Sequence, residues 1–453
     1  MRPRSARQVA VVGGGMVGLC VAWFLQERGV EVTVVERDRI TPGPTWGGAG
    51  ASWGSAGWLS PGLATPLPEP AVLRYGLRML LRPDSPVYVP PVADLTLARF
   101  LAGFVRNATI GRWRVAMTAL SGLTSRALDA FDVLAAGGVP ARTHSAAPFL
   151  ACYTNPADRD ALLAELAEIR ECGQPVHAVE GDAARAHELV PILSDSVRYA
   201  VRLYGQRFCD PGRFVAALAG AVRERGGVIQ ENTRVDEVID AGSHVRLVTS
   251  GLAAGGADSR EFGAEGSEAG ESDAGEQAGA GRGEGRYDAV VLANGAWLSR
   301  LARRFGVRAP VQAGRGYSFL VPVKEQPSGP VYFPAARVAC TPLDHGLRVA
   351  GMMEFRAPDA RPDRRRFDAI VAAARGLLRG VDLDSRTQEW VGPRPCTPDG
   401  LPLIGRTATR RVFVAGGHGM WGITLGPVTG QLLAEAVVDG VIPPELRPFD
   451  PLR

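Results

Sequence analysis

Lysine and clustered metal ligands are nearly missing from this chain of 453 residues. It has one lysine, Lys324, and six histidines, and its six cysteines form no CxxC pair. We therefore expect reduced thiols and no metal site, which is typical of a cytoplasmic setting. No stretch reaches the roughly 18 apolar residues that a membrane-spanning helix needs, so no span is expected.

The chain also has no strong excess of one charge, because it contains 51 basic and 47 acidic residues. The 50 arginines are typical of a GC-rich coding sequence, so they do not indicate a nucleic-acid partner, and none is expected. Eight acids and two arginines fall between Asp258 and Glu284, which leaves 39 acids and 49 bases, or +10, elsewhere. That balance favours anionic ligands and is compatible with an anionic membrane surface.

The first forty residues carry the clearest motif. A β-branched stretch precedes three glycines in the order GxGxxG, and an apolar run and a second β-branched stretch follow them. Gly13 permits a tight turn, Gly15 leaves room for a pyrophosphate, and Gly18 lets the helix lie close to the sheet. Glu36 ends the second strand and can accept hydrogen bonds from ribose hydroxyls. The pattern predicts a dinucleotide site.

Residues 250–285 are rich in Gly, Ala, Ser and Glu and hold almost no large apolar side chain. Such a segment cannot bury enough surface to offset its ordering entropy, so we expect a disordered insertion in a hairpin. The flanking strands would be Val245–Val248 and Tyr287–Leu292. Other periodic stretches predict helices over 99–134, 156–171, 211–225 and 427–438, and strands over 147–153, 228–230, 233–235 and 411–416.

Several motifs together resemble the FAD-dependent D-amino acid oxidase superfamily, and within it the bacterial D-amino acid dehydrogenase group of the small subunit type. The resemblance spans nearly the whole chain apart from the insertion. The motifs that carry it are the glycine turn with Glu36 and the segments 51–62, 293–297, 314–318, 351–354, 390–400 and 417–422. Segment 51–62, in which Ser, Ala, Gly and Pro alternate with Trp, is the most specific to the dehydrogenases.

The resemblance implies an α/β protein with a discontinuous Rossmann-like FAD-binding domain and an α+β substrate domain built on a mixed or antiparallel sheet. We assign 1–95, 206–308 and 386–453 to the former, and 96–205 and 309–385 to the latter. FAD is expected to bind non-covalently, since no attachment motif is present. Its expected contacts are Gly13, Gly15, Met16, Val17, Gly18, Glu36, Arg37, Ser52, Ser55, Ala56, Gly57, Val235, Ala293, Asn294, Gly295, Trp297, Gly417, His418, Gly419, Met420 and Gly422.

Three residues are candidates for the chemistry. Arg394 lies between two prolines, and an arginine fork can hold a substrate carboxylate with two hydrogen bonds; a structural ion pair is the alternative. Tyr317 could donate its hydroxyl to the same carboxylate or be a core aromatic residue. His418 could contact the flavin, act as an acid or base, or pack within its loop.

The resemblance implies oxidative deamination of a D-amino acid, or of a related small amino acid such as D-hydroxyproline. A hydride would pass from Cα to flavin N5, and the imino acid would hydrolyse to a 2-oxo acid and ammonia. A glycine or sarcosine oxidase that forms hydrogen peroxide, and a non-catalytic FAD-binding subunit, are the alternatives. A quinone or another flavoprotein is the expected electron acceptor. The expected location is the cytoplasm, or the periphery of the inner face of the cell membrane.

Overall fold

A six-stranded sheet contains the amino-terminal glycine motif in this computed structural model, which describes residues 6–40, 50–69, 87–90, 94–252 and 282–453. Its strand order is β10-β2-β1-β14-β21-β20, and all neighbours are parallel except β20 and β21. The strands are β1 Gln8–Val12, β2 Glu31–Val35, β10 Val228–Gln230, β14 Ala289–Leu292, β20 Leu403–Arg406 and β21 Val412–Gly416. Central strands such as β14 are buried along their whole length, as is typical of parallel sheets covered on both faces.

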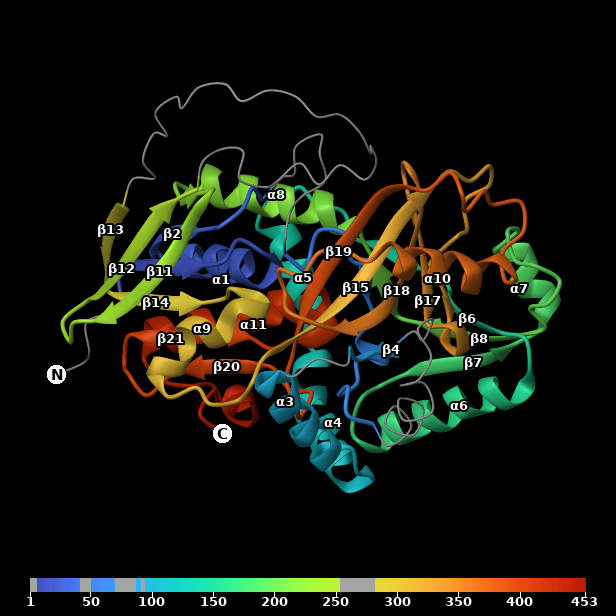
Figure 1. The fold of residues 1–453 in the computed structure, drawn as a ribbon, viewed down its shortest axis with the longest axis horizontal. Coiled ribbons are helices and arrows are strands. Elements are labelled where there is room, and N and C mark those ends of the chain that lie inside the picture. Colours follow the sequence, from blue (N-terminus) through green and yellow to red (C-terminus); the bar gives the residue numbers. More distant parts are fainter. Residues whose placement is uncertain (1–5, 41–49, 70–86, 91–93, 253–281) are drawn as a thin grey trace, which may run out of the picture.

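Helices that lie far apart in the sequence pack together on this sheet (Figure 1). They are α1 Met16–Glu27, α8 Pro211–Glu224 and α11 Gly422–Asp439. A Cβ on Gly430 of α11 would lie 2.6 Å from the backbone of Cys20 in α1, so only glycine permits this contact. The Asp210 carboxylate accepts the Arg213 N–H and caps α8, with Pro211 in its first turn, as the sequence predicts.

A three-stranded antiparallel sheet, in the order β11-β12-β13, extends from the six-stranded sheet, which we call the nucleotide sheet because it carries the glycine motif of the predicted dinucleotide site. Its strands are β11 Thr233–Asp240, β12 Val245–Gly251 and β13 Arg282–Tyr287. The predicted hairpin therefore exists, but its second strand is Arg282–Tyr287, whereas residues 289–292 join the parallel sheet as β14. Most of the predicted insertion, residues 253–281, lies outside the described residues.

Deletion of residues 253–281 is expected to leave the protein folded. The segment holds one large apolar side chain, Phe262, and joining Leu252 to Arg282 through Asn-Gly keeps the Ser250–Arg282 pair of the hairpin. The melting temperature should change by no more than about 2 °C. A deletion extended through Tyr287 removes β13 and is the control that should destabilise. A large loss of stability on the shorter deletion would contradict the prediction.

A nine-stranded sheet forms the second half of the molecule, in the order β19-β15-β18-β17-β16-β6-β8-β7, with β4 paired to β18. Figure 1 shows it to the right of the nucleotide sheet. Its strands are β4 Val87–Tyr88, β6 Phe149–Tyr153, β7 His177–Gly181, β8 Tyr199–Tyr204, β15 Gln312–Val321, β16 Val331–Phe333, β17 Val338–Leu343, β18 Gly346–Phe355 and β19 Thr387–Cys396. Helix α10, Arg364–Arg375, packs on one face of this sheet through Phe367 and Ile370.

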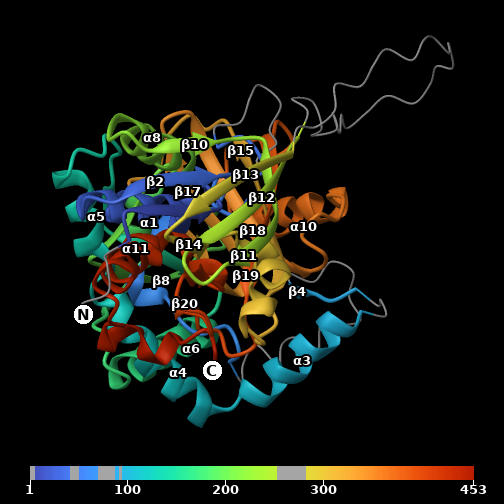
Figure 2. The same cartoon turned by 90° about the vertical axis from the view of Figure 1, so that its left-hand side faces the viewer.

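The remaining elements connect and flank the two large sheets. A small sheet joins β3 Trp58–Leu59, β9 Gln206–Phe208 and β5 His144–Ala146. The other helices are α3 Leu95–Asn107, α4 Ile110–Thr124, α5 Ala127–Ala136, α6 Pro156–Glu171, α7 Ala183–Leu189 and α9 Leu298–Ala302. In Figures 1 and 2, α3 and α4 lie along the lower edge of the molecule. Among the described residues, none of the helices is both long and apolar enough to cross a membrane.

Three sequence expectations differ from the structure. The continuous helix predicted over 99–134 is three helices, because the chain turns at Ala108–Thr109 and again at Ser125–Arg126. The predicted segment 386–453 of the FAD-binding domain contains β19, which instead pairs with β15 in the nine-stranded sheet. Strand β4, from the predicted segment 1–95, pairs with β18 in the same sheet. The other segment boundaries remain predictions.

Candidate active site

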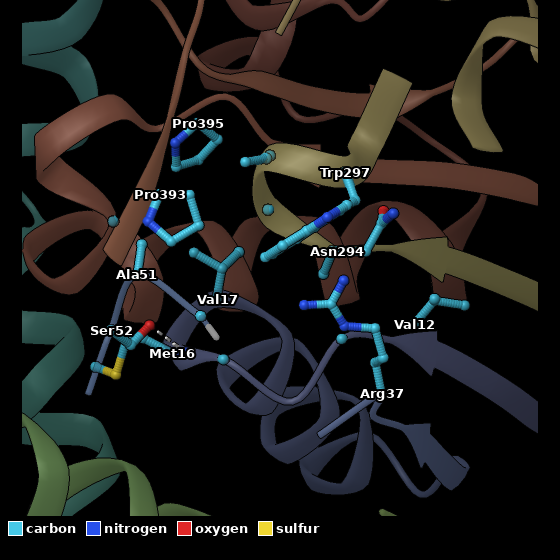
Figure 3. A pocket seen from close by; sticks show the side chains of 18 of the residues that line it. Val12, Met16, Val17, Arg37, Ala51, Ser52, Asn294, Trp297, Pro393 and Pro395 are labelled. Carbon is cyan, nitrogen blue, oxygen red and sulfur yellow. Dashed lines mark hydrogen bonds between the residues drawn. The ribbon is translucent and has the colours of Figure 1, made fainter. Parts of the chain in front are cut away.

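A long pocket opens at the carboxyl ends of β1, β2, β14 and β21, where α/β sheets bind their ligands. It contains about 1230 Å³ of empty space, part of it continuous with solvent. Figure 3 shows Pro393 and Pro395 of β19 across the pocket from Arg37 and Trp297. The pocket therefore runs from the end of β2 to the edge of the nine-stranded sheet.

The three glycines of the motif have different structural roles in the turn between β1 and α1. Gly13 has φ +111°, and a Cβ there would lie 2.5 Å from the Ala293 carbonyl oxygen. A Cβ on Gly18 would lie 2.0 Å from the Gly13 carbonyl oxygen, so Gly18 packs inside the turn and does not line the pocket. Gly15 lines the pocket, and a Cβ there would meet only the Ser52 hydroxyl, at 3.4 Å. The backbone at Gly15 is thus the part of the turn that a ligand can approach.

The start of α1 and the end of β2 place polar groups on this pocket. The Met16 N–H donates to the Ser52 hydroxyl at 3.1 Å, the dashed line in Figure 3. The Glu36 carboxylate accepts the Gly14 N–H at 2.5 Å and the Asp38 N–H at 2.9 Å. Burial raises the pKa of Glu36, while these two N–H groups oppose the shift. Because each carboxylate oxygen has two lone pairs, Glu36 can still accept hydrogen bonds from a ligand.

Arg37 and Trp297 form the wall next to Glu36. The Arg37 guanidinium lies 4.0 Å from the centre of the Trp297 ring. The exposed Asp359 accepts from Arg37 at 3.2 Å and from the Trp297 indole N–H at 2.8 Å. These contacts give the two side chains a defined orientation at the rim of the pocket.

The turn after β14 brings a second backbone segment to the pocket. Gly295 has φ +56°, and a Cβ there would have no atom within 4 Å. The Asn294 side-chain oxygen is buried and has no hydrogen-bond partner among the described residues. Ala293 and Val235, also predicted from the sequence, line the same wall. A ligand that donates a hydrogen bond to Asn294 would satisfy this oxygen.

The Ser52–Gly57 loop passes between the nucleotide sheet and the nine-stranded sheet. Ser52 and Ser55 line the pocket, whereas Ala56 and Gly57 do not. Gly57 packs against the Cys209 carbonyl oxygen, where a Cβ would be 2.1 Å away. Ala56 and Gly57 therefore hold the loop in place without lining the pocket.

The glycine-rich segment before α11 closes the far side. Met420, Gly419 and Gly422 line the pocket, while Gly417 packs against Thr397 instead. His418 also lines the pocket, but its Nε2 lies 3.0 Å from the Thr429 hydroxyl inside the protein. Burial lowers the pKa of His418 to about 3, so the ring is neutral at physiological pH.

Arg394 lies on β19 at the end of the pocket. Its Nη1 donates to the Met352 carbonyl oxygen at 2.9 Å, and the guanidinium packs on Gly316, where a Cβ would be 2.1 Å from Nη2. Burial lowers the pKa of Arg394, but a guanidinium remains charged in proteins. Within the described part of the chain, no carboxylate lies within 4.0 Å of it. Arg394 thus presents a positive charge that an anionic ligand could neutralise.

Tyr317, predicted as a carboxylate contact, lies on the other face of the sheet. It is fully buried, its hydroxyl donates to the Glu354 carboxylate at 2.6 Å, and its ring packs edge-on against Phe367 of α10. Burial is the main cause that raises the pKa of Tyr317. Because side chains alternate along a strand, Gly316 shares the face of Arg394 and Tyr317 does not. The prediction that Tyr317 contacts the substrate is therefore wrong.

Comparison with known proteins then identifies the family. The family described as "DAO: FAD dependent oxidoreductase" matches residues 8–436. The chain belongs to this family. It is an FAD-dependent oxidoreductase of the DAO family, and FAD is its cofactor.

Known proteins of similar sequence or fold extend over the same length. The chain is 27% identical over 440 residues to a D-amino acid dehydrogenase of Cereibacter sphaeroides, covering 96% of this chain and 92% of the other. Its fold is similar to glycine oxidase from Geobacillus kaustophilus, with a TM-score of 0.68, 22% identity and coverage of 100% and 99%. It is also similar to L-proline dehydrogenase from P. horikoshii, with a TM-score of 0.63, 18% identity and coverage of 100% and 98%. These likenesses confirm the predicted fold class.

The pocket of this DAO family member fits FAD at several points. The exposed backbone of Gly15 and the N-terminus of α1 suit a pyrophosphate, Glu36 suits ribose hydroxyls, and the unsatisfied Asn294 oxygen can accept a further hydrogen bond. Some residues that line the pocket were not predicted from the sequence. Arg234, Arg300, Pro393 and Pro395 are among them, and the only sequence signal was the proline pair around Arg394.

We expect acid precipitation to release the flavin of this DAO family member into the supernatant. All six cysteines are buried, and none of them lines the long pocket. The pocket histidine, His418, directs Nε2 toward Thr429. The measurement is the absorbance of supernatant and pellet after precipitation, and yellow colour that stays in the pellet would contradict a non-covalent cofactor.

Proposed function

We propose that the protein oxidises the carbon–nitrogen bond of a D-amino acid, or of a related small amino acid such as D-hydroxyproline. The observation that supports this is Arg394, a half-buried cation at the end of the pocket with no described carboxylate within 4.0 Å. A guanidinium fork binds a carboxylate with two parallel hydrogen bonds, and every amino acid carries that group. The likeness to a D-amino acid dehydrogenase supports the choice of substrate class.

In this proposal the protein contributes orientation and electrostatics. Arg394 holds the substrate carboxylate, which fixes the direction of the Cα–H bond. Bound FAD supplies the chemistry, because its oxidised ring accepts a hydride equivalent from the substrate. The substrate amine must be neutral. Since His418 is neutral and engaged with Thr429, we assign it no proton transfer. Water then hydrolyses a primary imino acid to a 2-oxo acid and ammonia.

Anaerobic reduction of the purified holoprotein tests the proposal. D-amino acids, D-hydroxyproline, glycine and sarcosine are mixed with it one at a time, and loss of flavin absorbance is followed. Bleaching by D-amino acids or D-hydroxyproline supports the proposal, and bleaching by none of the four contradicts it. On readmission of oxygen, stoichiometric hydrogen peroxide would instead identify an oxidase.

We also propose that a quinone or another flavoprotein accepts the electrons, at the inner face of the membrane. Helices α3 and α4 support this location, since they expose large apolar side chains beside arginines at the edge seen in Figure 2. The apolar residues are Leu95, Val105, Ile110 and Val115, and the arginines are Arg99, Arg106 and Arg112. Exposed apolar side chains together with exposed arginines suit an anionic lipid surface. Flotation with vesicles that contain anionic lipid, compared with neutral vesicles, tests the location, and equal recovery contradicts it.

A further inference from the structure

We propose that Arg348 is a positioning residue of the flavin site, with a buried charge that favours reduced FAD. Through Ser318 its guanidinium fixes the Ser52–Gly57 loop, and its positive charge lies directly behind that loop. The inference rests on FAD as the cofactor and is independent of which amino acid is the substrate.

Arg348 lies in the interior of the nine-stranded sheet. It is 2% exposed and sits on β18, opposite Leu320 of β15 and Thr341 of β17. Its Nη1 donates to the Ser318 hydroxyl at 3.3 Å, and Nη2 lies 3.5 Å from the Gln388 side-chain oxygen. Its Nε is buried without a hydrogen-bond partner in the described part of the chain. Burial of the guanidinium lowers its pKa.

Arg348 differs in its partners from two other buried arginines, Arg315 of β15 and Arg366 of α10. Arg315 and Arg366 lie within 4.0 Å of the Glu354 carboxylate. The acid that acts electrostatically on Arg348 is Asp210, and its carboxylate contacts Arg213 and His345, at 3.7 and 3.9 Å. No described carboxylate lies within 4.0 Å of Arg348 itself. A buried cation without a close counter-ion projects its field over a longer range than a paired one.

The charge is tied directly to the wall of the FAD pocket. The Ser318 hydroxyl that accepts from Arg348 donates to the Gly54 carbonyl oxygen at 2.6 Å. Gly54 lies between Ser52 and Ser55, which both line the pocket. The opposite residue, Thr341, donates in the same way to the Ala56 carbonyl oxygen at 2.7 Å. Ser318 of β15 and Thr341 of β17 thus hold the loop, and Arg348 lies on β18, the strand between them.

Arg348 also lies at the Arg394 end of the pocket. Arg394 packs on Gly316, and Ser318 is the next residue of β15 on the same face. The two arginines therefore face the same side of the sheet, Arg394 from opposite Gly314 and Arg348 from opposite Leu320, and their guanidinium groups contact Gly316 and Ser318, two residues apart on β15. Arg394 borders the open pocket, whereas Arg348 is covered by the loop. A ligand cannot neutralise Arg348 by direct contact there, so its charge acts through the loop on whatever carries charge in the pocket.

Reduction of FAD adds negative charge to the ring, so a fixed positive charge behind the loop stabilises the reduced form. The test compares FAD-loaded Arg348→Met, Arg348→Lys and Ser318→Ala variants with the parent. Two readouts are independent of turnover: the midpoint potential of bound FAD, and the Kd of sulfite, an anion that adds to oxidised flavin. Arg348→Met should lower the midpoint potential of bound FAD by about 30 mV or more and weaken sulfite binding at least about tenfold. The two effects correspond, because about 30 mV is a tenfold change in the equilibrium constant of a two-electron couple.

The other two variants separate charge from position. Arg348→Lys keeps the charge and should retain most of the parent potential and sulfite affinity. Ser318→Ala removes the hydrogen bond to the Gly54 carbonyl and keeps the charge, so it should weaken FAD binding with a smaller change in potential. An FAD-loaded Arg348→Met protein with the parent potential and sulfite affinity overturns the proposal. A Lys variant shifted as far as the Met variant overturns it as well.

Asp210→Asn gives a test that does not depend on the folding of an Arg348 variant. Asn caps a helix as well as Asp, so α8 should remain intact. The substitution removes the acid that acts on Arg348 and should therefore tighten sulfite binding and raise the potential. Unchanged or weaker sulfite binding in this variant contradicts the proposal.

Discussion

A Gly15→Val variant is expected to fold and to carry no FAD. The backbone at Gly15 has φ −75° and ψ 179°, an extended conformation that valine adopts without strain. A Cβ there would meet only the Ser52 hydroxyl of the protein, and the valine side chain would project into the part of the pocket that suits the pyrophosphate. FAD affinity should fall at least about a hundredfold, which corresponds to about 2.8 kcal/mol. The measurement is flavin content after purification, together with titration of the apoprotein with FAD.

Gly18→Val is the matched control, because it changes the same motif at a position inside the turn. A Cβ there would lie 2.0 Å from the Gly13 carbonyl oxygen, so α1 could not keep its place on the sheet. This variant should lose the fold itself, seen as aggregation or loss of circular dichroism. Gly15→Val protein that purifies with stoichiometric flavin would contradict the assignment of this turn to the pyrophosphate.

Arg394→Lys is expected to bind FAD and to lose amino acid turnover. Lysine keeps the charge but not the planar fork, so one of two hydrogen bonds to a carboxylate is lost, as well as the bond to the Met352 carbonyl. A charge-assisted pair is worth on the order of 1.5–3 kcal/mol, so kcat/KM should fall at least about tenfold. The measurement is kcat/KM for the best amino acid substrate, with flavin content as the check on folding.

Arg394→Ala should lose more, and more for amino acids than for amines that lack a carboxylate. Tyr317→Phe is the control on the opposite face of the same sheet, since its hydroxyl bonds Glu354 away from the pocket. It should change stability by about 1 kcal/mol and leave KM nearly unchanged. The proposal is falsified if Arg394→Ala binds FAD and reduces it with an amino acid at an unchanged kcat/KM.

The nucleotide half could be predicted from the sequence because its constraints are local. Gly18 packs on the carbonyl oxygen of Gly13 in the same turn, and Gly15 leaves the start of α1 open to a ligand, so the spacing of the motif is enough to predict this turn. The cap of α8 by Asp210 is local in the same way. Strand β13 escaped prediction because its sequence, RGEGRY, has no β-branched residue and adjoins the Gly-rich insertion. Pairing with β12 makes it a strand, and pairing is not a local property.

The substrate half could be predicted less well because strand parity and bulges decide which face a side chain occupies. Arg394 was recognised from its neighbours, but nothing in the sequence places Tyr317 on the face of α10. The β15–β18 register shifts between Arg315 and Tyr317. The sequence therefore does not show which of the alternating side chains of these strands face the pocket. The same applies to Arg348, whose burial depends on strands β15 and β17 on either side.

The central strand of the nucleotide sheet has a consequence for synthesis on the ribosome. Strand β1 pairs with β2 nearby but also with β14, and Val9 lies opposite Ala289, about 280 residues later. At a translation rate of roughly 5–20 residues per second, strand β14 is synthesised on the order of 15–60 s after β1. During this interval an apolar strand has one open edge, which invites aggregation. We therefore expect recovery of active protein from an expression host to depend on chaperone capacity and on growth temperature more than on the supply of riboflavin.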